Sequence, residues 1–239
     1  MLESLGDFFA ENALATILSA IIAYLLGSIN FAIIITGLFI KKDIRTMGSG
    51  NAGMTNVFRS VGKAAGVLTL IGDFLKGVVA LLIARAIYIN LGGDIMKTEL
   101  GMNSPIMVAS YLSGFFCLLG HLFPLYFGFR GGKGILTTAG MLAIIDWRIL
   151  LILLTIFIIV FIITRIVSIS SIIAVTLLPV FTFLFTFFHP FSSQGMGPEY
   201  VALCTALALL FAITIIIMHK DNIKRLRNGT EKKFSFKKN

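Results

Sequence analysis

The sequence has few charged residues, and this scarcity excludes an ordinary soluble protein. Only 13% of the 239 residues are charged, whereas 57% are hydrophobic and the mean hydropathy is +0.97. Soluble domains average about 25% charged and about 45–50% apolar residues. In water this chain would expose large apolar patches, whereas a bilayer accommodates them. The composition therefore predicts an integral membrane protein.

Cysteine is also scarce, which excludes a disulfide scaffold and a zinc site. Cys117 and Cys204 both lie inside apolar runs, so neither a disulfide framework nor zinc-ligand spacing is available. We expect no metal and no cofactor. The N-terminal residues MLESLGDFFAEN lack the basic region of a signal peptide, so we expect no cleaved leader.

The net charge of +9 does not indicate a nucleic-acid-binding protein. Its Lys and Arg residues cluster in a few loops and in a basic tail at residues 227–239. Such clusters set membrane topology and contact anionic headgroups. We therefore expect membrane lipid, and no nucleic acid, as a partner.

Apolar segments fill most of the chain. A helix needs about 20 apolar residues to cross a bilayer. Four stretches reach this length and two come close: 13–40, 64–90, 105–127 and 167–188, then 150–164 and 200–218. The stretch 135–145 is shorter, and we expect it to form a short helix shielded by its neighbours. No internal repeat is evident, so we predict one membrane-embedded domain over residues 1–239.

Basic residues divide unevenly between the two sides of the membrane if all seven segments cross. One side then receives only Lys97 and Arg148, while the other receives Lys41, Lys42, Arg45, Arg59, Lys63, Arg130, Lys133, Arg165 and the basic tail. Cytoplasmic loops are rich in Lys and Arg, so this pattern predicts an external N-terminus and a cytoplasmic C-terminus. Six crossings would lose the asymmetry. We therefore predict an all-α, polytopic protein with seven transmembrane helices, the fourth of them short.

Three of the predicted helix starts on the cytoplasmic side combine Gly, Ser or Thr with a cation, which is typical of anion binding. The first is Gly48-Ser49-Gly50-Asn51-Ala52-Gly53, whose glycines allow backbone N–H groups to approach a phosphate. We expect a helix to begin near Asn51. Helical spacing would then place Thr55, Asn56 and Arg59 on one face. A capped cytoplasmic turn is the alternative.

The second such helix start is Gly131-Gly132-Lys133-Gly134, which precedes Thr137 and Thr138. Glycines beside a lysine at a helix start suit a phosphate. The segment is not a Walker A loop, because Phe127 stands where that motif needs Gly and Gly134 stands where it needs Ser or Thr. Nucleotide hydrolysis is therefore not expected.

Hydroxyl and amide side chains mark the third such helix start and one helix C-terminus on the same side. Ser170 and Ser171 follow Arg165 at the start of the sixth segment, where simple capping is an equally good interpretation. His219 and Asn222 share one face at the end of the seventh segment. We expect them to turn inward, while the basic face of Lys220, Lys224 and Arg227 meets headgroups.

A few ionisable residues lie within the predicted membrane segments, where charge is costly. Asp73 and Lys76 are one helical turn apart, so a structural ion pair and a substrate contact by Lys76 are both open. Arg85 lies near the outer end of its segment, and we expect it to extend toward lipid headgroups. We expect His121 to be a packing residue.

The chain resembles the PlsY acyltransferases over essentially its whole length. Three blocks carry the resemblance: GSGNAGMTNVFRSVGKAAGVLTLIGDFLKG (48–77), GHLFPLYFGFRGGKG (120–134) and HKDNIKRL (219–226). RIVSISS (165–171) matches a weaker fourth block. The order of the blocks and the length of the first two make the match specific.

The resemblance implies transfer of a fatty acyl group from acyl phosphate to the 1-hydroxyl of glycerol 3-phosphate, which gives 1-acylglycerol 3-phosphate for membrane phospholipid synthesis. It also implies a multi-pass protein of the bacterial inner membrane, with a cytoplasmic active site and coupling to an enzyme that forms acyl phosphate.

The resemblance and the anion-binding patterns together supply the candidate site residues. The expected catalytic residues are Ser49, Arg59, Lys133, His219 and Asn222. The expected substrate-binding residues are Gly50, Asn51, Thr55, Asn56, Lys76, Gly131, Gly132, Gly134, Thr137, Thr138, Ser170 and Ser171.

Two other functions would also need cations at membrane helix ends. A transporter of a phosphorylated or anionic solute is the main alternative, although transporters usually place such groups at the bilayer midplane between repeated halves. An acyl-CoA-dependent acyltransferase would carry a His-x4-Asp motif. The residues five positions after the three histidines are Tyr126, Gln194 and Lys224, so this motif is absent.

Overall fold

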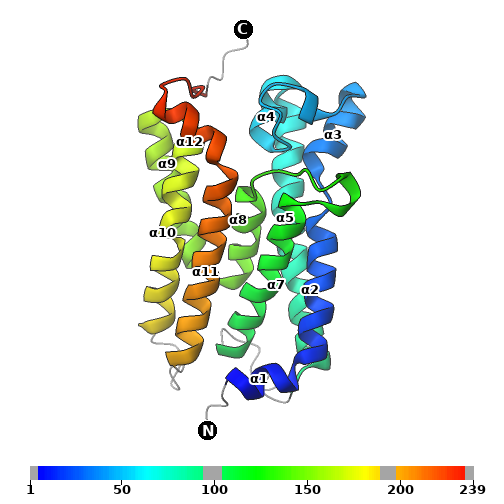
Figure 1. The fold of residues 1–239 in the computed structure, drawn as a ribbon, viewed down its shortest axis with the longest axis vertical. Coiled ribbons are helices and arrows are strands. Elements are labelled where there is room, and N and C mark those ends of the chain that lie inside the picture. Colours follow the sequence, from blue (N-terminus) through cyan, green and yellow to red (C-terminus); the bar gives the residue numbers. More distant parts are fainter. Residues whose placement is uncertain (1–4, 94–103, 189–197, 235–239) are drawn as a thin grey trace. The chain divides into compact units, whose positions relative to one another are not determined.

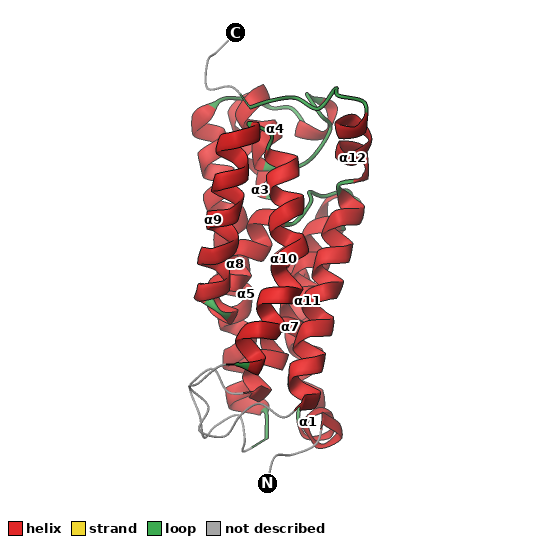
Figure 2. Ribbon diagram, turned by 90° about the vertical axis from the view of Figure 1, so that its left-hand side faces the viewer, coloured by secondary structure: helices red, strands yellow, loops and turns green. Residues whose placement is uncertain are grey.

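The computed structural model describes residues 5–93, 104–188 and 198–234, and within these ranges every regular element is a helix (Figures 1 and 2). The elements are α1 (Leu5–Glu11), α2 (Ala13–Gly27), α3 (Phe31–Ile40), η1 (Ile44–Thr46), α4 (Met54–Ser60), α5 (Lys63–Leu91), α7 (Ser104–Leu122), η2 (Leu125–Phe127), α8 (Ile135–Ile145), α9 (Trp147–Thr164), α10 (Val167–Phe187), α11 (Pro198–Met218) and α12 (Lys220–Arg227). The predicted all-α class is confirmed for the part of the chain described.

Within the described residues, six helical segments are long and apolar enough to cross a membrane. They are Ala13–Ile40, Lys63–Leu91, Pro105–Phe127, Trp147–Thr164, Val167–Phe187 and Pro198–Met218. The shorter apolar helix α8 has the same bounds as its predicted segment. The stretches 91–104 and 189–199, which separate predicted segments, fall largely outside the described residues.

The first of these spans has the predicted bounds, 13–40, but it consists of two helices. α2 ends at Gly27 and α3 begins at Phe31, with Asn30 as the cap of α3. The Asn30 side-chain oxygen accepts a hydrogen bond from the Ile33 N–H at 3.1 Å, which favours a new helix start over continuation. Backbone interrupted inside an apolar segment needs partners from its neighbours. Here the partners are the side chains of Asp73 and Lys76 on α5.

The chain folds into two compact units, residues 1–145 and 146–239. In the first unit, α2 packs against α5 and α7, and α5 also packs against α8. Gly77 of α5 and Gly140 of α8 allow the close approach, because a Cβ on either would overlap the backbone of the other helix at Thr137 or Phe74. α1 lies at the end of this unit opposite α4 (Figure 1).

In the second unit, α10 packs between α9 and α11, and α12 follows α11 after a break at His219. Asp146 caps α9 and pairs with Arg148 at 2.6 Å. The Arg148 guanidinium also lies 4.8 Å from the centre of the Phe185 ring. This places a hydrogen-bonded arginine at the end of the unit opposite α12.

Arg85 corrects one expectation. Its Nε donates to the Ser110 hydroxyl at 3.0 Å, so the side chain turns toward α7 inside the first unit. The prediction that Arg85 extends to lipid headgroups is therefore wrong. Serine on the neighbouring helix supplied a partner that the sequence of α5 alone does not reveal.

Candidate functional site

One buried amide shapes the glycine loop at residues 48–53. Asn56 lies in the first turn of α4. Its side-chain oxygen accepts a hydrogen bond from the Ser49 N–H at 3.0 Å. Its nitrogen lies 3.2, 2.9 and 3.0 Å from the carbonyl oxygens of Ile44, Met47 and Asn51. The amide of Asn56 therefore organises the loop.

The loop needs glycine where it turns most tightly. Gly48 and Gly50 have φ angles of 58° and 72°, a region that side chains other than glycine rarely adopt. A Cβ on Gly48 would also overlap the Asn56 side-chain oxygen. As a result Ser49 is held on an exposed turn, and its hydroxyl makes no hydrogen bond to the residues described.

The expected helix after this loop begins later than predicted, at Met54. Gly53 is its N-cap, and Arg59 lies exposed in its last turn. Thr55 is half-buried, whereas Asn56 is 4% exposed and turned toward the loop. The three residues therefore do not act as one exposed face. Arg59 is the exposed residue among them.

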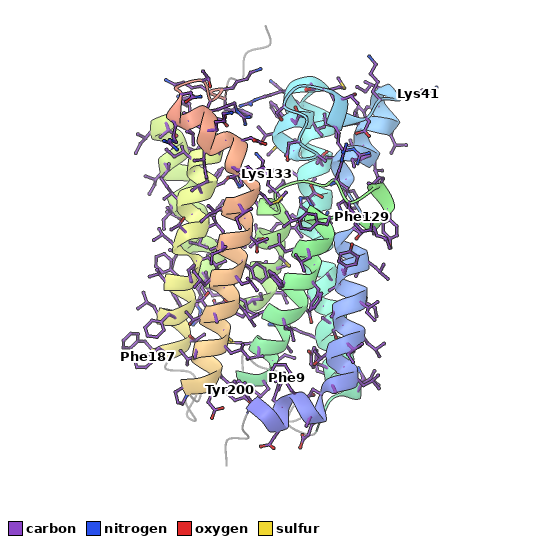
Figure 3. The ribbon with its side chains drawn as sticks, viewed as in Figure 1. Phe9, Lys41, Phe129, Lys133, Phe187 and Tyr200 are labelled. Atoms are coloured by element: carbon purple, nitrogen blue, oxygen red, sulfur yellow. The ribbon has the colours of Figure 1, made fainter. Side chains whose placement is uncertain are left out.

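The second glycine loop, residues 131–134, is attached to the end of α7. The N–H groups of Gly131 and Gly132 donate to the carbonyls of Leu122 and His121 at 3.0 and 3.2 Å. Lys133 is half-buried on this loop, toward the end of the unit that carries Lys41 and away from Phe9 (Figure 3). The loop leads directly into α8.

Two threonines in the first turn of α8 present buried hydroxyls. Thr137 and Thr138 are 0% and 5% exposed, and neither hydroxyl oxygen has a hydrogen-bond partner among the described residues. Buried polar groups normally find a partner. An anion at the start of α8 would supply one, since helix N-termini attract negative charge.

Arg45 joins this loop region to the segment before the first glycine loop, a role that the sequence analysis did not identify. Its guanidinium donates to the Asp43 carboxylate from Nε and Nη2, and to the carbonyls of Phe127 and Arg130 at 2.6 and 3.2 Å. The Arg45 side-chain hydrogen bonds lower the pKa of Asp43 below its ordinary value. The short spacing of Asp43 and Arg45 is the sequence feature that could have indicated this ion pair.

Asp73 and Lys76 form the ion pair that was one of two open interpretations. Lys76 Nζ lies 2.9 Å from Asp73 Oδ1, and each side chain is 2% exposed. The same ammonium lies 2.7 Å from the Ile29 carbonyl and 2.8 Å from His121 Nδ1. The ammonium is therefore engaged by one carboxylate and two further polar partners within the protein, and the structure favours the ion pair over substrate contact.

In the second unit, the predicted inward face at the end of α11 is present. His219 and Asn222 are 3% and 7% exposed, whereas the basic residues Lys220, Lys224 and Arg227 are exposed. His219 Nδ1 lies 2.8 Å from the Ile215 carbonyl and must donate to it, since a carbonyl only accepts. This contact fixes the Nδ1–H tautomer if the imidazole is neutral.

Glu231 is the residue in this unit that the sequence analysis missed. Its carboxylate accepts hydrogen bonds from Asn222, Arg225 and Ser168 at 2.6, 2.6 and 2.7 Å. Burial acts to raise the pKa of Glu231, but the hydrogen bonds outweigh it and the pKa lies below its ordinary value. Glu231 is the single acidic residue of the basic tail, and this is the sequence feature that could have indicated its role.

The start of the predicted basic tail is therefore folded against the unit. The Phe234 N–H donates to the Arg165 carbonyl at 2.7 Å, and the Phe234 ring contacts that of Phe161. These contacts, with Glu231, fix the chain through residue 234.

Ser170 and Ser171 are buried in the first turns of α10. Their hydroxyls donate to the carbonyls of Ile166 and Val167, each at 2.9 Å. Contact with an anion would therefore require both hydroxyls to rotate. No group of three or more His, Cys, Asp or Glu side chains among the described residues could hold a metal ion.

These features define a polytopic helical membrane protein with glycine loops and buried hydroxyls at helix ends. The chain belongs to the glycerol-3-phosphate acyltransferase family, whose model matches residues 17–229. The glycerol-3-phosphate acyltransferase of Clostridioides difficile (strain 630) is 38% identical over 222 residues, covering 93% of this chain and 97% of the relative. That of Enterococcus faecalis (strain ATCC 700802 / V583) is 36% identical and covers 90% of each chain.

Solved structures give the same family. The crystal structure of PlsY, an integral membrane glycerol 3-phosphate acyltransferase, in its glycerol 3-phosphate form has a TM-score of 0.73 at 32% identity. The match covers 92% of this chain and 96% of that one. Its lysophosphatidic acid form has a TM-score of 0.69 at the same identity. The resemblance to PlsY acyltransferases is therefore confirmed.

Proposed function

We propose that this protein transfers a fatty acyl group from acyl phosphate to the 1-hydroxyl of glycerol 3-phosphate, giving 1-acylglycerol 3-phosphate. The observation that carries the proposal is the relation to glycerol-3-phosphate acyltransferases over more than nine-tenths of the chain. The two PlsY structures, in glycerol 3-phosphate and lysophosphatidic acid forms, match the expected acceptor and product.

The proposed enzyme is a multi-pass protein of the bacterial inner membrane. We propose seven crossings, with α8 as the short fourth one, an external N-terminus and a cytoplasmic C-terminus. The distribution of Lys and Arg supports this topology. Its active site would face the cytoplasm, where an acyl-phosphate-forming enzyme would supply the donor.

In the first unit, the loop 131–134 and the start of α8 are proposed to hold the phosphate of the donor. Lys133 supplies a cation there, and the buried hydroxyls of Thr137 and Thr138 supply hydrogen bonds that no described residue takes. An opposite charge at about 4 Å is worth about 4 kcal/mol at an effective dielectric of about 20.

The other glycine loop is proposed to serve the acceptor and the reacting carbonyl. The Asn51 backbone, the exposed Ser49 hydroxyl and the Arg59 guanidinium are proposed to donate to anionic oxygens. Gly50 is proposed to shape this site, since its N–H donates to the Met47 carbonyl at 2.9 Å. Asn56 contributes by shaping this loop, through the hydrogen bonds that occupy its amide.

In the second unit, Ser170, Ser171, His219 and Asn222 are proposed to take part in the same reaction. Glu231 holds the Asn222 amide, and the Ile215 carbonyl holds the His219 ring. Their burial supports roles in orienting substrate, since groups held this way lose little freedom on binding.

The proposed chemistry is direct acyl transfer without a cofactor. The 1-hydroxyl oxygen attacks the acyl carbon, the bond from that carbon to the phosphate oxygen breaks, and inorganic phosphate leaves. A substrate phosphate oxygen accepts the hydroxyl proton. Since an acyl phosphate is already activated, the protein mainly orients two anions and stabilises developing charge.

The decisive experiment is an acylation assay with purified protein and synthetic acyl phosphate. Acylation of glycerol 3-phosphate from acyl phosphate, but not from acyl-CoA or acyl carrier protein, is expected. Use of acyl-CoA in preference would overturn the proposed donor. Flux of glycerol 3-phosphate into proteoliposomes without acylation would favour the transporter alternative.

A further inference from the structure

The buried Asp73–Lys76–His121 cluster lies beneath the two glycine loops and has no part in the chemistry above. It supports the break between α2 and α3. The Ile29 carbonyl accepts from Lys76, and the Phe31 N–H donates to the Asp73 carboxylate. A buried ion pair of this kind is costly unless its remaining groups are hydrogen-bonded, and here the backbone of the break supplies partners.

The Lys76 ammonium also selects one tautomer of His121. A protonated lysine has donors only, so His121 Nδ1, which lies 2.8 Å from Nζ, must accept. A second proton on the ring would point Nδ1–H at the ammonium, which like charge opposes. The imidazole is therefore neutral, and its single proton lies on Nε2.

The Nε2 edge of His121 faces the place where the two loops meet. A Cβ added to Gly132 would overlap both His121 Nε2 and the carbonyl oxygen of Ala52. Ala52 belongs to the first glycine loop, and Gly132 belongs to the second. His121 is 3% exposed, and among the described residues Nε2 has no hydrogen-bond partner.

We infer that His121 is a substrate-binding residue whose Nε2–H donates to an oxygen of the acyl phosphate held at residues 131–134. Lys76, with Asp73, is the positioning residue that fixes the tautomer. This inference rests on the proposed function and adds to it a neutral donor in the first unit. The His121 side chain is 4% exposed, so a bound oxygen can reach the unpaired Nε2–H and supply the partner that a polar group in a protein interior normally has.

Two substitutions separate this role from a purely structural one. In His121→Asn, the side-chain oxygen can take the place of Nδ1 as acceptor for Lys76, but nothing replaces Nε2–H. In His121→Gln, the longer amide places a donor near Nε2 and removes the acceptor at Nδ1. A neutral donor to an anion contributes enough for about a 10- to 100-fold effect.

The measurements are kcat and KM for each substrate and the thermal midpoint of each purified variant. We expect His121→Asn to keep its midpoint and to lose about 10- to 100-fold in kcat/KM for acyl phosphate, with KM for glycerol 3-phosphate nearly unchanged. We expect His121→Gln to retain more activity, even with a lower midpoint.

Three outcomes would overturn the inference. One is a His121→Asn variant within about threefold of wild type. Another is the opposite order, with His121→Gln the less active variant. The third is loss of activity in both variants together with a fall in both midpoints, since that marks a structural role. A wild-type enzyme that fails to use acyl phosphate would instead refute the proposed function.

Discussion

Replacing Glu231 by Gln tests whether the folded tail supports the reaction. The carboxylate accepts hydrogen bonds from Asn222, Arg225 and Ser168, and its side chain is 10% exposed. An amide keeps one acceptor oxygen but turns an NH2 group toward at least one of these donors. The change removes charge and one hydrogen bond, and leaves the packing volume nearly unchanged.

The expected cost follows from these contacts. A buried hydrogen bond to a charged group contributes about 1.5–3 kcal/mol, which applies to the Asn222 contact. The Arg225 side chain is 38% exposed, so its contact with Glu231 adds only about 0.2–1 kcal/mol. We expect the free energy of unfolding to fall by about 2–4 kcal/mol in total. Because the carboxylate of Glu231 holds the Asn222 amide, the substitution should also lower kcat.

The assay pairs acyl-transfer kinetics with thermal unfolding in detergent. Asp221→Asn is the matched control, since Asp221 is exposed on the same helix, and it should behave like wild type. If Glu231→Gln retained both the rate and the midpoint of wild type, the carboxylate would have no supporting role and the reasoning would be wrong.

Acid provides an independent readout of the same carboxylate. The pKa of Glu231 is lower in the folded protein than its ordinary value of about 4.3. Its contribution to stability is therefore complete above that value and is lost as pH falls through the folded pKa. Wild type should therefore lose its stability advantage over Glu231→Gln as the pH falls below the ordinary carboxyl pKa and through the lower folded pKa of Glu231.

Three further predictions concern the reaction and the topology. Arg59→Ala and Lys133→Ala should each nearly abolish turnover in folded, inserted protein, because a charged hydrogen bond to phosphate in a dry site contributes several kcal/mol; Lys133→Ala with most of its activity would refute the phosphate-loop assignment. Reporter fusions should place the N-terminus outside and the C-terminus in the cytoplasm, and both ends on one side would exclude seven crossings. Labelled acyl phosphate alone should leave the protein unlabelled; a stoichiometric acyl label that is lost in Ser49→Ala would show an acyl-enzyme in place of direct transfer.

Much of the fold could be predicted because the membrane imposes simple length and composition rules. The bounds of α8 and the start of α10 match their predicted segments, since a polar or glycine-rich stretch ends each apolar run. The break at Ser28–Asn30 could not be predicted in the same way. It depends on a hydrogen bond that Asp73 accepts from the Phe31 N–H and one that Lys76 donates to the Ile29 carbonyl, and both side chains lie more than 40 residues away in the sequence.

The candidate site also has a part that local sequence predicts and a part that depends on residues distant in the sequence. The motifs and the family resemblance predicted Ser49, Lys133 and His219 as site residues, because binding two anions needs glycine, hydroxyl groups and cations at helix ends. The motifs did not distinguish residues that could contact substrate from residues that only shape the loop. Asn56 belongs to the second kind because its amide contacts three backbone carbonyls and one N–H.

The sequence by itself determined the membrane class, the helical segments and the family, since these follow from local composition and from long motifs. The tertiary structure decided which side chain meets which partner. Lys76 contacts the Ile29 carbonyl and His121, Arg85 donates to Ser110, and Glu231 accepts a hydrogen bond from Asn222. In each case the partner comes from another element, or from a turn that folds back on its own. Local spacing cannot specify such a contact, because a buried charge takes the hydrogen-bonding groups that packing brings within reach.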